Sequence, residues 1–294
     1  MPIFYRRLPR FKYLRPAGIE EALSLLGEHR EKARLLAGGT DLVPQLKGRQ
    51  IVLPECIVDI KNLIALKSIT YGDSGLSIGA LATVSNIAES SVIGEHYPVL
   101  VQAALSMASP QVRNRGTFVG NICTAIPSAD SAPSLLALDS AVRLRGPKEE
   151  RRVPLREFFV GPRKTTIEPD EIVVSIEVPQ PPRASRGVYL KLSPRHSMDL
   201  AVVGVAVVGT ARDGVCEDVR IAVGAVAPTP LRAPVAETML RGQKITSELI
   251  DEAARNAVTQ CDPIDDHRAS REYRCDMVRV MVRRALGQVL SCEG

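Results

Sequence analysis

The chain of 294 residues carries 45% hydrophobic and 24% charged residues, the proportions of an ordinary globular protein. Its net charge of +5 comes without a basic run, which argues against nucleic acid or a membrane surface as a partner. The longest apolar run, residues 200–211, is about half of the roughly 20 residues that span a bilayer, and no export signal follows Met1. We therefore expect a cytoplasmic protein.

The first part of the chain, residues 1–54, predicts a small parallel sheet, because a strand, a helix and a second strand follow one another. The first strand is expected at 11–14. The helix is expected at 19–26, where apolar residues recur at i, i+3, i+4 and i+7. Gly27 stands where it would end this helix.

The second strand, residues 34–37, runs directly into Gly38-Gly39-Thr40-Asp41, which we call the first glycine loop. Two glycines at the end of a strand allow positive φ and leave backbone N–H groups exposed. Thr40 or Asp41 is suited to cap the helix that follows. The loop matches neither the dinucleotide fingerprint nor a P-loop, so any phosphate site here is of another kind.

Between residues 55 and 178 the pattern predicts an antiparallel subdomain. Two alternating runs flank the turn Gly72-Asp73-Ser74-Gly75, which is typical of a hairpin. Pro98 suits the first turn of a helix that extends to residue 108. The other expected elements are helices at 84–90 and 133–138, a second hairpin of strands at 141–145 and 151–155, and a closing strand at 172–178.

The segment from Met107 to Asp130 reads MASPQVRNRGTFVGNICTAIPSAD and is a second candidate site. A polar turn leads to a short strand entry around Gly120 (residues 117–121) and then to a hydroxyl-rich loop that stops at Asp130. Glycine permits close backbone approach, and hydroxyls, amides and a carboxylate suit a nucleotide's phosphates and ribose. An ordinary strand-turn-helix connection is the alternative interpretation of this segment.

The proline-rich stretch Pro179–Pro182 predicts an internal boundary, after which residues 183–294 form a C-terminal domain. Strands in this domain would make a three-stranded antiparallel sheet with helices packed on it. Thr246 and Ser270 are near the expected N-caps of two helices. The expected strands are 188–192, 200–210 and 219–225, and the expected helices are 235–240, 248–259 and 272–290.

The six cysteines lie far apart in the sequence. An iron–sulfur cluster needs about four thiolates, usually with at least two close together, and no such group is present here. We expect these cysteines to be small buried apolar side chains. A metal site of Cys261, His267 and Cys275 fits no zinc pattern in its spacing.

Three stretches now point to one family: AGGTDL (37–42), TFVGNICTAIPSAD (117–130) and YLKLSPRHSMDLAVVGVA (189–206). In this order and spacing, the sequence resembles the FAD-binding medium subunits of the molybdenum hydroxylases, which include carbon monoxide dehydrogenase and quinoline oxidoreductase. The flavin domain of xanthine dehydrogenase is similar too. The resemblance covers nearly the whole chain. It implies an α+β protein with a two-subdomain FAD-binding fold of the PCMH/VAO type (residues 1–54 and 55–178), followed by the C-terminal sheet and helices.

The resemblance also implies the site. FAD would be bound noncovalently, since Cys123 is the one evident attachment point near either segment. Asp130 would accept a hydrogen bond from ribose or adenine, and Lys191 would place positive charge near the isoalloxazine. Backbone N–H groups of the first glycine loop, Gly120 and Asn121 could donate to the pyrophosphate. No catalytic and no metal-binding residue is expected, and the implied FAD contacts are Leu35, Leu36, Ala37, Gly38, Gly39, Thr40, Asp41, Leu42, Ala108, Thr117, Gly120, Asn121, Thr124, Ser128, Asp130, Val173 and Lys191.

Two departures from the family concern residues near the flavin. This chain has Val119-Gly120-Asn121 where many relatives have Gly-Gly-Asn, and Met107 where xanthine dehydrogenase relatives place an aromatic side chain. Leu200 stands where others have an aliphatic or aromatic lid. These residues leave the identity of the electron acceptor open among NAD, quinone, ferredoxin and oxygen. The direction of electron flow is open as well.

The implied function is that of an electron-transfer subunit. FAD in this chain would exchange electrons with a small [2Fe–2S] subunit, and a large molybdopterin subunit would carry the substrate chemistry. The implied assembly is a dimer of heterotrimers. The alternative is a self-sufficient FAD-dependent oxidoreductase of the same wider fold, although no histidine stands in a recognisable catalytic setting. A nucleotide-binding scaffold without redox chemistry is a third hypothesis. The substrate itself would be set by another chain.

Overall fold

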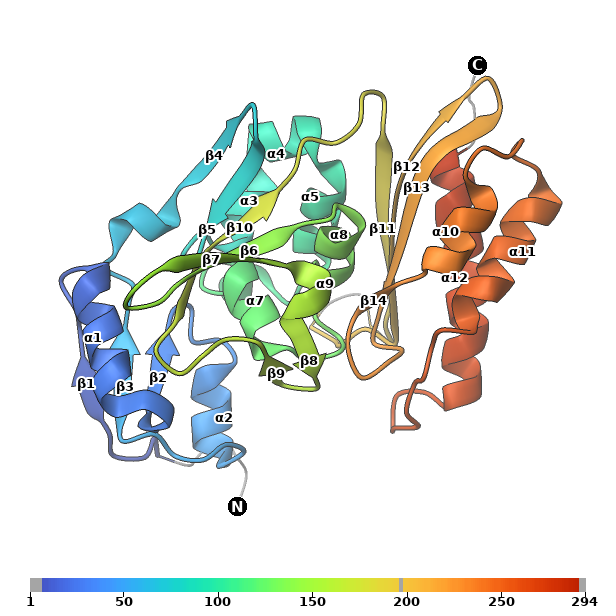
Figure 1. Cartoon of the computed structure of the whole chain (residues 1–294). Helices are drawn as coiled ribbons and strands as arrows, with labels where there is room; N and C mark the ends of the chain where they lie inside the picture. Colours follow the sequence, from blue (N-terminus) through green and yellow to red (C-terminus); the bar gives the residue numbers. More distant parts are fainter. Residues whose placement is uncertain (1–6, 196–197, 291–294) are drawn as a thin grey trace.

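The computed structural model describes residues 7–195 and 198–290 of the chain. Three sheets follow one another across the molecule in Figure 1, beginning with the N-terminal one and ending with the C-terminal one. A two-stranded hairpin, β8 (Phe159–Gly161) and β9 (Lys164–Thr165), lies below the middle sheet in this view. The protein therefore has the mixed α and β composition that the sequence predicts.

The first sheet is parallel and has the strand order β1-β3-β2, with bounds Lys12–Leu14, Cys56–Asp59 and Ala33–Leu36. This confirms the predicted parallel sheet. Every residue of β3 is buried, which suits the central position. Because β3 belongs to this sheet, the sheet continues past residue 54, where we expected the first subdomain to end.

Helix α1 (Ile19–His29) buries Ala22, Leu23 and Leu26 against this sheet, as the periodicity predicts. It does not end at Gly27, contrary to the expectation. Gly27 faces open space and stays helical, and the chain leaves the helix at Arg30, whose φ of 44° is left-handed. A short 3-10 turn, η2 (Arg30–Lys32), then leads into β2, and α2 (Leu42–Gly48) follows the first glycine loop.

The middle sheet is antiparallel, with the order β4-β5-β10-β6-β7. Both predicted hairpins are confirmed, and β10 lies between them, so that the last strand of this region joins two hairpins far apart in sequence. A short 3-10 turn, η3 (Ile64–Lys67), precedes the sheet. The strands are β4 (Ile69–Gly72), β5 (Gly75–Gly79), β6 (Ala141–Arg145), β7 (Glu150–Pro154) and β10 (Ile172–Val178).

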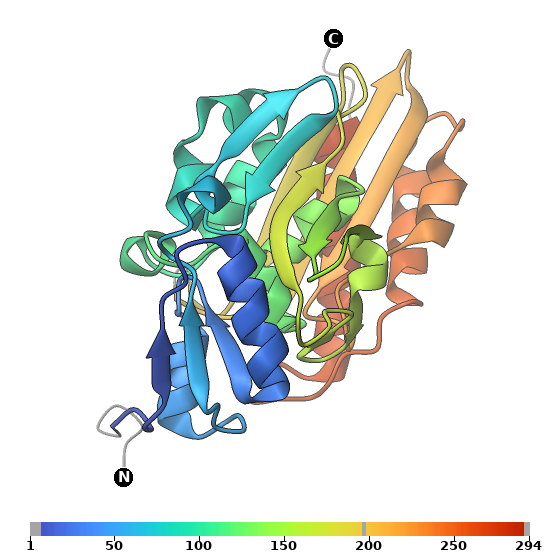
Figure 2. The same cartoon turned by 60° about the vertical axis from the view of Figure 1, so that its left-hand side comes forward.

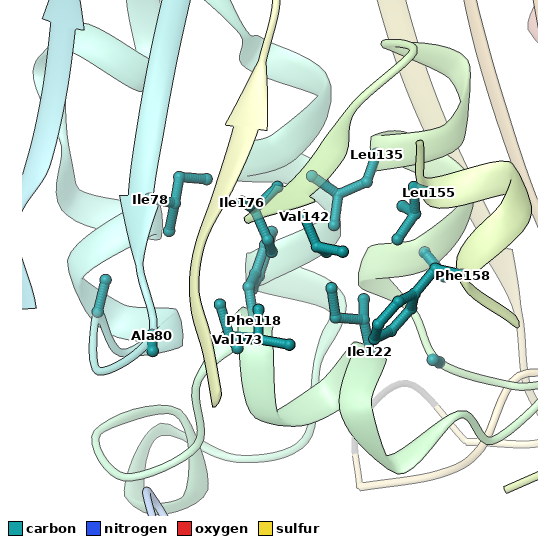
Figure 3. Close-up of a cluster of buried hydrophobic side chains, with 14 of the residues drawn as sticks. Ile78, Ala80, Phe118, Ile122, Leu135, Val142, Leu155, Phe158, Val173 and Ile176 are labelled. Atoms are coloured by element: carbon teal, nitrogen blue, oxygen red, sulfur yellow. The ribbon is translucent and has the colours of Figure 1, made fainter. Parts of the chain in front are cut away.

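Helices cover this sheet and form its core. Figure 3 shows side chains such as Phe118, Ile122 and Leu135 meeting Val142 and Ile176 of the sheet. This packing fixes the segment that carries the second candidate site, because Phe118 and Ile122 belong to it. The helices of this part are α3 (Val84–Glu89), α4 (Ser91–His96), α5 (Pro98–Ser106), α6 (Pro110–Arg113), α7 (Phe118–Thr124), α8 (Ser131–Ala137) and α9 (Leu155–Phe158).

The strand entry expected at residues 117–121 is wrong, because this stretch forms the start of α7. Thr117 is the N-cap, and its Oγ1 accepts a hydrogen bond from the N–H of Gly120 at 2.9 Å. Phe118, Val119 and Ile122 are buried on one side of the helix. The threonine cap and this helical spacing outweigh the helix-weakening effect of Gly120.

The third sheet has four antiparallel strands in the order β11-β12-β13-β14, where we expected three. The added strand β14 is only Leu231–Arg232, too short to show an alternating pattern in the sequence. Strand β11 spans Arg186–Leu192, β12 Val203–Arg212 and β13 Val215–Gly224. The β12 strand starts three residues later than residue 200, at which we expected it to begin.

Helices α10 (Pro234–Leu240), α11 (Ser247–Val258) and α12 (Arg271–Leu290) lie together beyond the third sheet in Figures 1 and 2. Thr246 caps α11 and Ser270 caps α12 through their hydroxyl oxygens, as predicted. Helices α5 and α8 of the preceding region contact the same sheet. The sheet is therefore packed on both sides, which explains why eight consecutive residues of β12 are buried.

The buried side chains form two hydrophobic clusters. The first joins the region before Pro179 to one face of the third sheet through Tyr189, Ala206, Val208 and Ala222, and the second lies within the C-terminal region. The exact domain boundaries at 54, 178 and 183 stay predictions. Cys56 and Cys216 are buried, and Cys123, Cys261 and Cys275 are half-buried. Among the described residues, no group of three or more potential metal ligands lies together, and no helix is long and apolar enough to cross a membrane.

Candidate functional site

A cavity of about 790 Å³ lies where the first glycine loop meets the segment from Met107 to Asp130. The start of β10, the turn between β8 and β9 and residues that follow β11 also contribute to its lining. Of the contacts implied by the family resemblance, Leu36 and Lys191 do not line the cavity. Those that do line it are Leu35, Ala37, Gly38, Gly39, Thr40, Asp41, Leu42, Ala108, Thr117, Gly120, Asn121, Thr124, Ser128, Asp130 and Val173.

The first glycine loop has the free donors that the sequence predicts. Within the described part of the chain, the N–H groups of residues 38–41 make no hydrogen bond to a protein group. Gly39 has a φ of +76°, which glycine adopts without strain. Gly38 is needed for a different reason: a Cβ there would lie 2.0 Å from the carbonyl oxygen of Arg115. The first glycine therefore lets the two segments touch, and the second turns the chain.

A side-chain hydrogen bond also joins the two segments. Thr124 Oγ1 donates to Asp41 Oδ2 at 3.2 Å and is also 2.8 Å from the carbonyl oxygen of Gly120. Asp41 occupies the N-cap position of α2, but its carboxylate makes no capping hydrogen bond. The expected side-chain cap is therefore wrong. The carboxylate instead holds the first glycine loop to α7.

The backbone donors expected from Gly120 and Asn121 are already used inside the protein. Gly120 N–H donates to Thr117 Oγ1, and Asn121 N–H donates to the Thr117 carbonyl at 2.9 Å. The expectation that these two N–H groups bind an anion is wrong. The Asn121 N–H makes the first backbone hydrogen bond of the helix, and the Gly120 N–H is capped by the Thr117 side chain. Gly120 therefore offers no backbone donor to the cavity, and Asn121 can act there only through its side chain.

Asn121 offers such a side chain. Its Oδ1 accepts a hydrogen bond from Ser131 Oγ at 2.6 Å, which fixes the orientation of the amide. Its NH₂ group has no partner in the described structure, and Asn121 is among the residues that line the cavity. Ser128 contributes a hydroxyl to the same lining. Two neutral donors are thus available beside the charged groups of the cavity.

Asp130 is held by two residues of β11. Its carboxylate accepts from Tyr189 Oη at 2.9 Å and from Lys191 Nζ at 2.8 Å. Burial raises the pKa of the Asp130 carboxyl, and the Lys191 ammonium and both hydrogen bonds oppose that rise. Burial and the Asp130 charge together raise the pKa of Tyr189 well above its ordinary value. The three side chains form a buried, hydrogen-bonded group at the cavity wall.

We expected Lys191 to contact the flavin directly. Lys191 does not line the cavity, and its ammonium group is instead bound to Asp130, which does. Its Nζ also donates to the carbonyl oxygen of Ser106 at 3.2 Å. Sequence reasoning missed Tyr189. The signal was present, because residues two apart on a strand share one face, and Tyr189 precedes Lys191 by two positions.

Other cavity residues had no signal in the sequence. Glu171 is held by Arg151 through two hydrogen bonds of 2.6 and 2.7 Å, which outweigh burial and lower the pKa of its carboxyl. The three positions that the sequence analysis named as departures from the family, Val119, Met107 and Leu200, all line the cavity. The lining also includes the arginines Arg34, Arg113, Arg163, Arg195 and Arg268.

Cys123 lines the cavity as well, and burial raises the pKa of its thiol to about 12. A thiol reacts as its thiolate, so at neutral pH this side chain is a poor nucleophile. No histidine occurs among the described residues of the lining. The cavity thus presents backbone donors, amide and hydroxyl donors, cationic side chains and an apolar wall, which are the features needed to bind a dinucleotide that carries a diphosphate.

Two family descriptions match the chain. Residues 9–181 match the FAD binding domain in molybdopterin dehydrogenase, and residues 188–289 match the CO dehydrogenase flavoprotein C-terminal domain. Together these matches cover most of the chain and separate at the proline-rich stretch.

Individual relatives agree over nearly the full length. The chain is 37% identical to the carbon monoxide dehydrogenase medium chain of Hydrogenophaga pseudoflava, over 95% of this chain and 96% of that one. It is 34% identical to the xanthine dehydrogenase FAD-binding subunit of Escherichia coli O157:H7, over 96% and 97%.

Solved structures show the same relationship. The Hydrogenophaga pseudoflava carbon monoxide dehydrogenase superposes with a TM-score of 0.93 at 37% identity, over 96% of this chain and 98% of that one. Quinoline 2-oxidoreductase from Pseudomonas putida 86 gives 0.91 at 28% identity, over 97% and 98%. The chain therefore belongs to the FAD-binding flavoprotein subunits of the molybdopterin dehydrogenases, and it is an electron-transfer subunit of a molybdenum-containing oxidoreductase.

Proposed function

We propose that FAD binds noncovalently in the cavity with its diphosphate on the backbone N–H groups of Gly38, Gly39, Thr40 and Asp41. The observation that carries this proposal is that these donors have no protein partner, although they lie at a cavity wall. Unpaired N–H groups are costly where water is excluded, and an anion satisfies them. Neutral backbone donors also bind the diphosphate without placing further charge in the wall.

The remaining contacts are proposed to be made by side chains. The NH₂ group of Asn121 and the hydroxyls of Thr117 and Ser128 are the candidate donors to ribose or ring oxygens. Asp130 can accept one further hydrogen bond, because each carboxylate oxygen has more than one acceptor site. The Lys191 and Tyr189 contacts keep this carboxylate in place and offset its charge, so Lys191 acts on FAD through Asp130.

Cys123 supports the noncovalent part of the proposal, because a thiol of pKa about 12 is almost wholly protonated near pH 7. Acid precipitation of the purified holoprotein should release all of its yellow chromophore into the supernatant. Retention of flavin in the washed pellet would show a covalent link, and a Cys123→Ser variant would then identify the attachment point.

Bound FAD supplies a centre that can exchange electrons singly or in pairs with its partners. The protein residues around it hold and orient it, and the described lining offers no histidine base for chemistry on an organic substrate. We therefore propose that substrate conversion occurs on a large molybdopterin subunit, and that a small [2Fe–2S] subunit connects it to this chain. Relatives named as medium chains support an assembly with larger and smaller partners.

The proposed assembly is a dimer of heterotrimers in the cytoplasm. The test is affinity purification of the tagged chain from its native host, followed by mass determination and metal analysis. We expect two further polypeptides, with molybdenum and about two irons per FAD. The reconstituted chain alone should bind FAD but should not turn over an organic substrate. A lone chain that does so would establish the self-sufficient oxidoreductase instead.

A further inference from the structure

The turn between β8 and β9 contains a residue that its local geometry does not favour. Gly161 pairs with Lys164, so Pro162 and Arg163 form the two-residue turn between them. Proline suits the first of these positions, and the second has positive φ, where Gly or Asn is the usual residue. Here it is Arg163, with a φ of 59°. A bulky side chain thus occupies a position where glycine would adopt the same backbone without strain.

The same residue is anchored at a second strained position. Arg163 N–H donates to the carbonyl oxygen of Ala125 at 2.7 Å, and Ala125, at the end of α7, has a φ of 48°. Two left-handed residues that are not glycine are thus joined at the cavity. Such conformations persist only where the surrounding structure enforces them, and they occur often at ligand-binding sites.

The guanidinium of Arg163 differs from the other arginines of the cavity. Arg34 and Arg113 donate to backbone carbonyls, while Arg195 and Arg268 pair with Asp199 or Asp266. Arg163 lines the cavity and is exposed, and its side chain has no partner in the described part of the chain. It is therefore free to meet an anion.

Its position is tied to the first glycine loop by a short series of contacts. Ala125 follows Thr124, and Thr124 holds Asp41 of that loop. The backbone of Arg163 is thus fixed one residue away from the hydrogen bond that joins the loop to α7. We propose that Arg163 is the cationic residue that binds the FAD diphosphate opposite the N–H groups of the loop. This inference rests on the proposed function of the loop.

The first test is Arg163→Gly, because the proposal predicts effects of opposite sign. Relief of the left-handed backbone should raise the unfolding midpoint of the flavin-free protein by about 2 °C. Loss of a charge-assisted hydrogen bond should weaken FAD binding about tenfold, measured by quenching of flavin fluorescence. A residue that only shapes the turn would change the midpoint and leave FAD affinity at the wild-type value, and that result would overturn the proposal.

Further measurements identify the diphosphate as the group recognised. Arg163→Gln should weaken ADP binding as much as FAD binding, leave adenosine binding unchanged and reduce the salt dependence of FAD affinity. Equal weakening for adenosine would show a contact to the base and overturn the diphosphate assignment. Lys164→Gln is the matched control, because Lys164 is exposed and does not line the cavity. This variant should bind FAD, ADP and adenosine with wild-type affinity. If the wild-type chain itself failed to bind FAD, the proposed function would be wrong independently of Arg163.

Discussion

The first glycine loop and the start of α7 both contain glycine, a threonine and a polar residue, yet they offer a ligand different groups. The loop leaves the N–H groups of residues 38–41 without protein partners. In α7, Thr117 accepts from both Gly120 and Asn121, through its side chain and its carbonyl. All four residues of the loop thus keep their main-chain donors, whereas in α7 the N–H groups of Gly120 and Asn121 are not available to a ligand.

The difference shows what a glycine motif alone does not say. Gly38 permits contact between the two segments, Gly39 turns the chain, and Gly120 lies within a helix beside its own threonine cap. The loop leaves its donors unused because residues 38–41 precede α2, whereas Gly120 and Asn121 lie far enough into α7 for Thr117 to accept from both. The same distinction applies to acids: Asp41 joins the two segments, whereas Asp130, at the end of the second, depends on Lys191 from β11.

The largest expected effect tests that dependence. Lys191→Met removes the counter-charge of Asp130 and should lower the free energy of unfolding by roughly 3–5 kcal/mol near pH 7. The folded-state pKa of Asp130, already raised by burial, should rise further. Folding then favours the protonated acid, so this contribution to stability is present below the unfolded pKa and is lost as pH rises through the folded pKa.

The check is chemical denaturation across a range of pH. The deficit of Lys191→Met relative to wild type should be small in acid and should grow toward neutral pH. Addition of Asp130→Asn to the variant should remove that pH dependence. Lys164→Met, at an exposed position, is the control. A deficit that does not change with pH would mean that Lys191 stabilises by packing alone.

The next effect concerns the contact between the two segments. Gly38→Val would place a Cβ 2.0 Å from the Arg115 carbonyl oxygen, so the loop must move away from its neighbour. We expect loss of FAD binding and a destabilisation of about 3 kcal/mol, measured by flavin content and thermal unfolding. Gly27→Ala is the control, because nothing lies within 4 Å of its added Cβ. Wild-type flavin content in Gly38→Val would remove the loop from the site.

A smaller loss of stability is expected when the Gly120 N–H loses its acceptor, because this N–H group stabilises the helix and does not bind a ligand. Thr117→Val removes the oxygen that accepts the Gly120 N–H, and should lower the stability of the flavin-free protein by about 1 kcal/mol. Thr117→Ser keeps the cap and should recover most of the loss. Unchanged stability of the valine variant without FAD would show that the cap is dispensable, and would weaken the contrast between the two segments.

The smallest effect is expected at the link between them. Thr124→Val removes the hydrogen bond to Asp41, whose carboxylate can regain water, so the loss of stability should be about 0.5–1 kcal/mol. FAD affinity should fall by several-fold, because the loop loses a tether at its last free N–H group. Thr124→Ser is the matched variant that keeps the hydroxyl. Calorimetric titration of both flavin-free variants would decide whether the tether matters to binding.

Much of the fold could be predicted because it depends on local patterns. Alternation and turn residues located both hairpins of the middle sheet, strand-helix-strand order indicated the parallel sheet, and Thr246 and Ser270 marked helix starts. Local patterns failed where two signals competed. The glycine in residues 117–121 favoured a strand entry, but the threonine cap and the buried face of α7 decided for a helix.

The sequence by itself indicated the two segments whose glycines, hydroxyls and acids meet at the cavity, but not residues such as Arg163 and Glu171 that complete its lining. Tertiary structure alone decided which of their polar groups remain free. The Gly120 N–H is occupied, the N–H groups of residues 38–41 are not, and Asp130 is neutralised by residues distant in the chain. The physical reason is that a hydrogen-bonding group serves a ligand only when no protein partner takes it, and that depends on every segment folded around it.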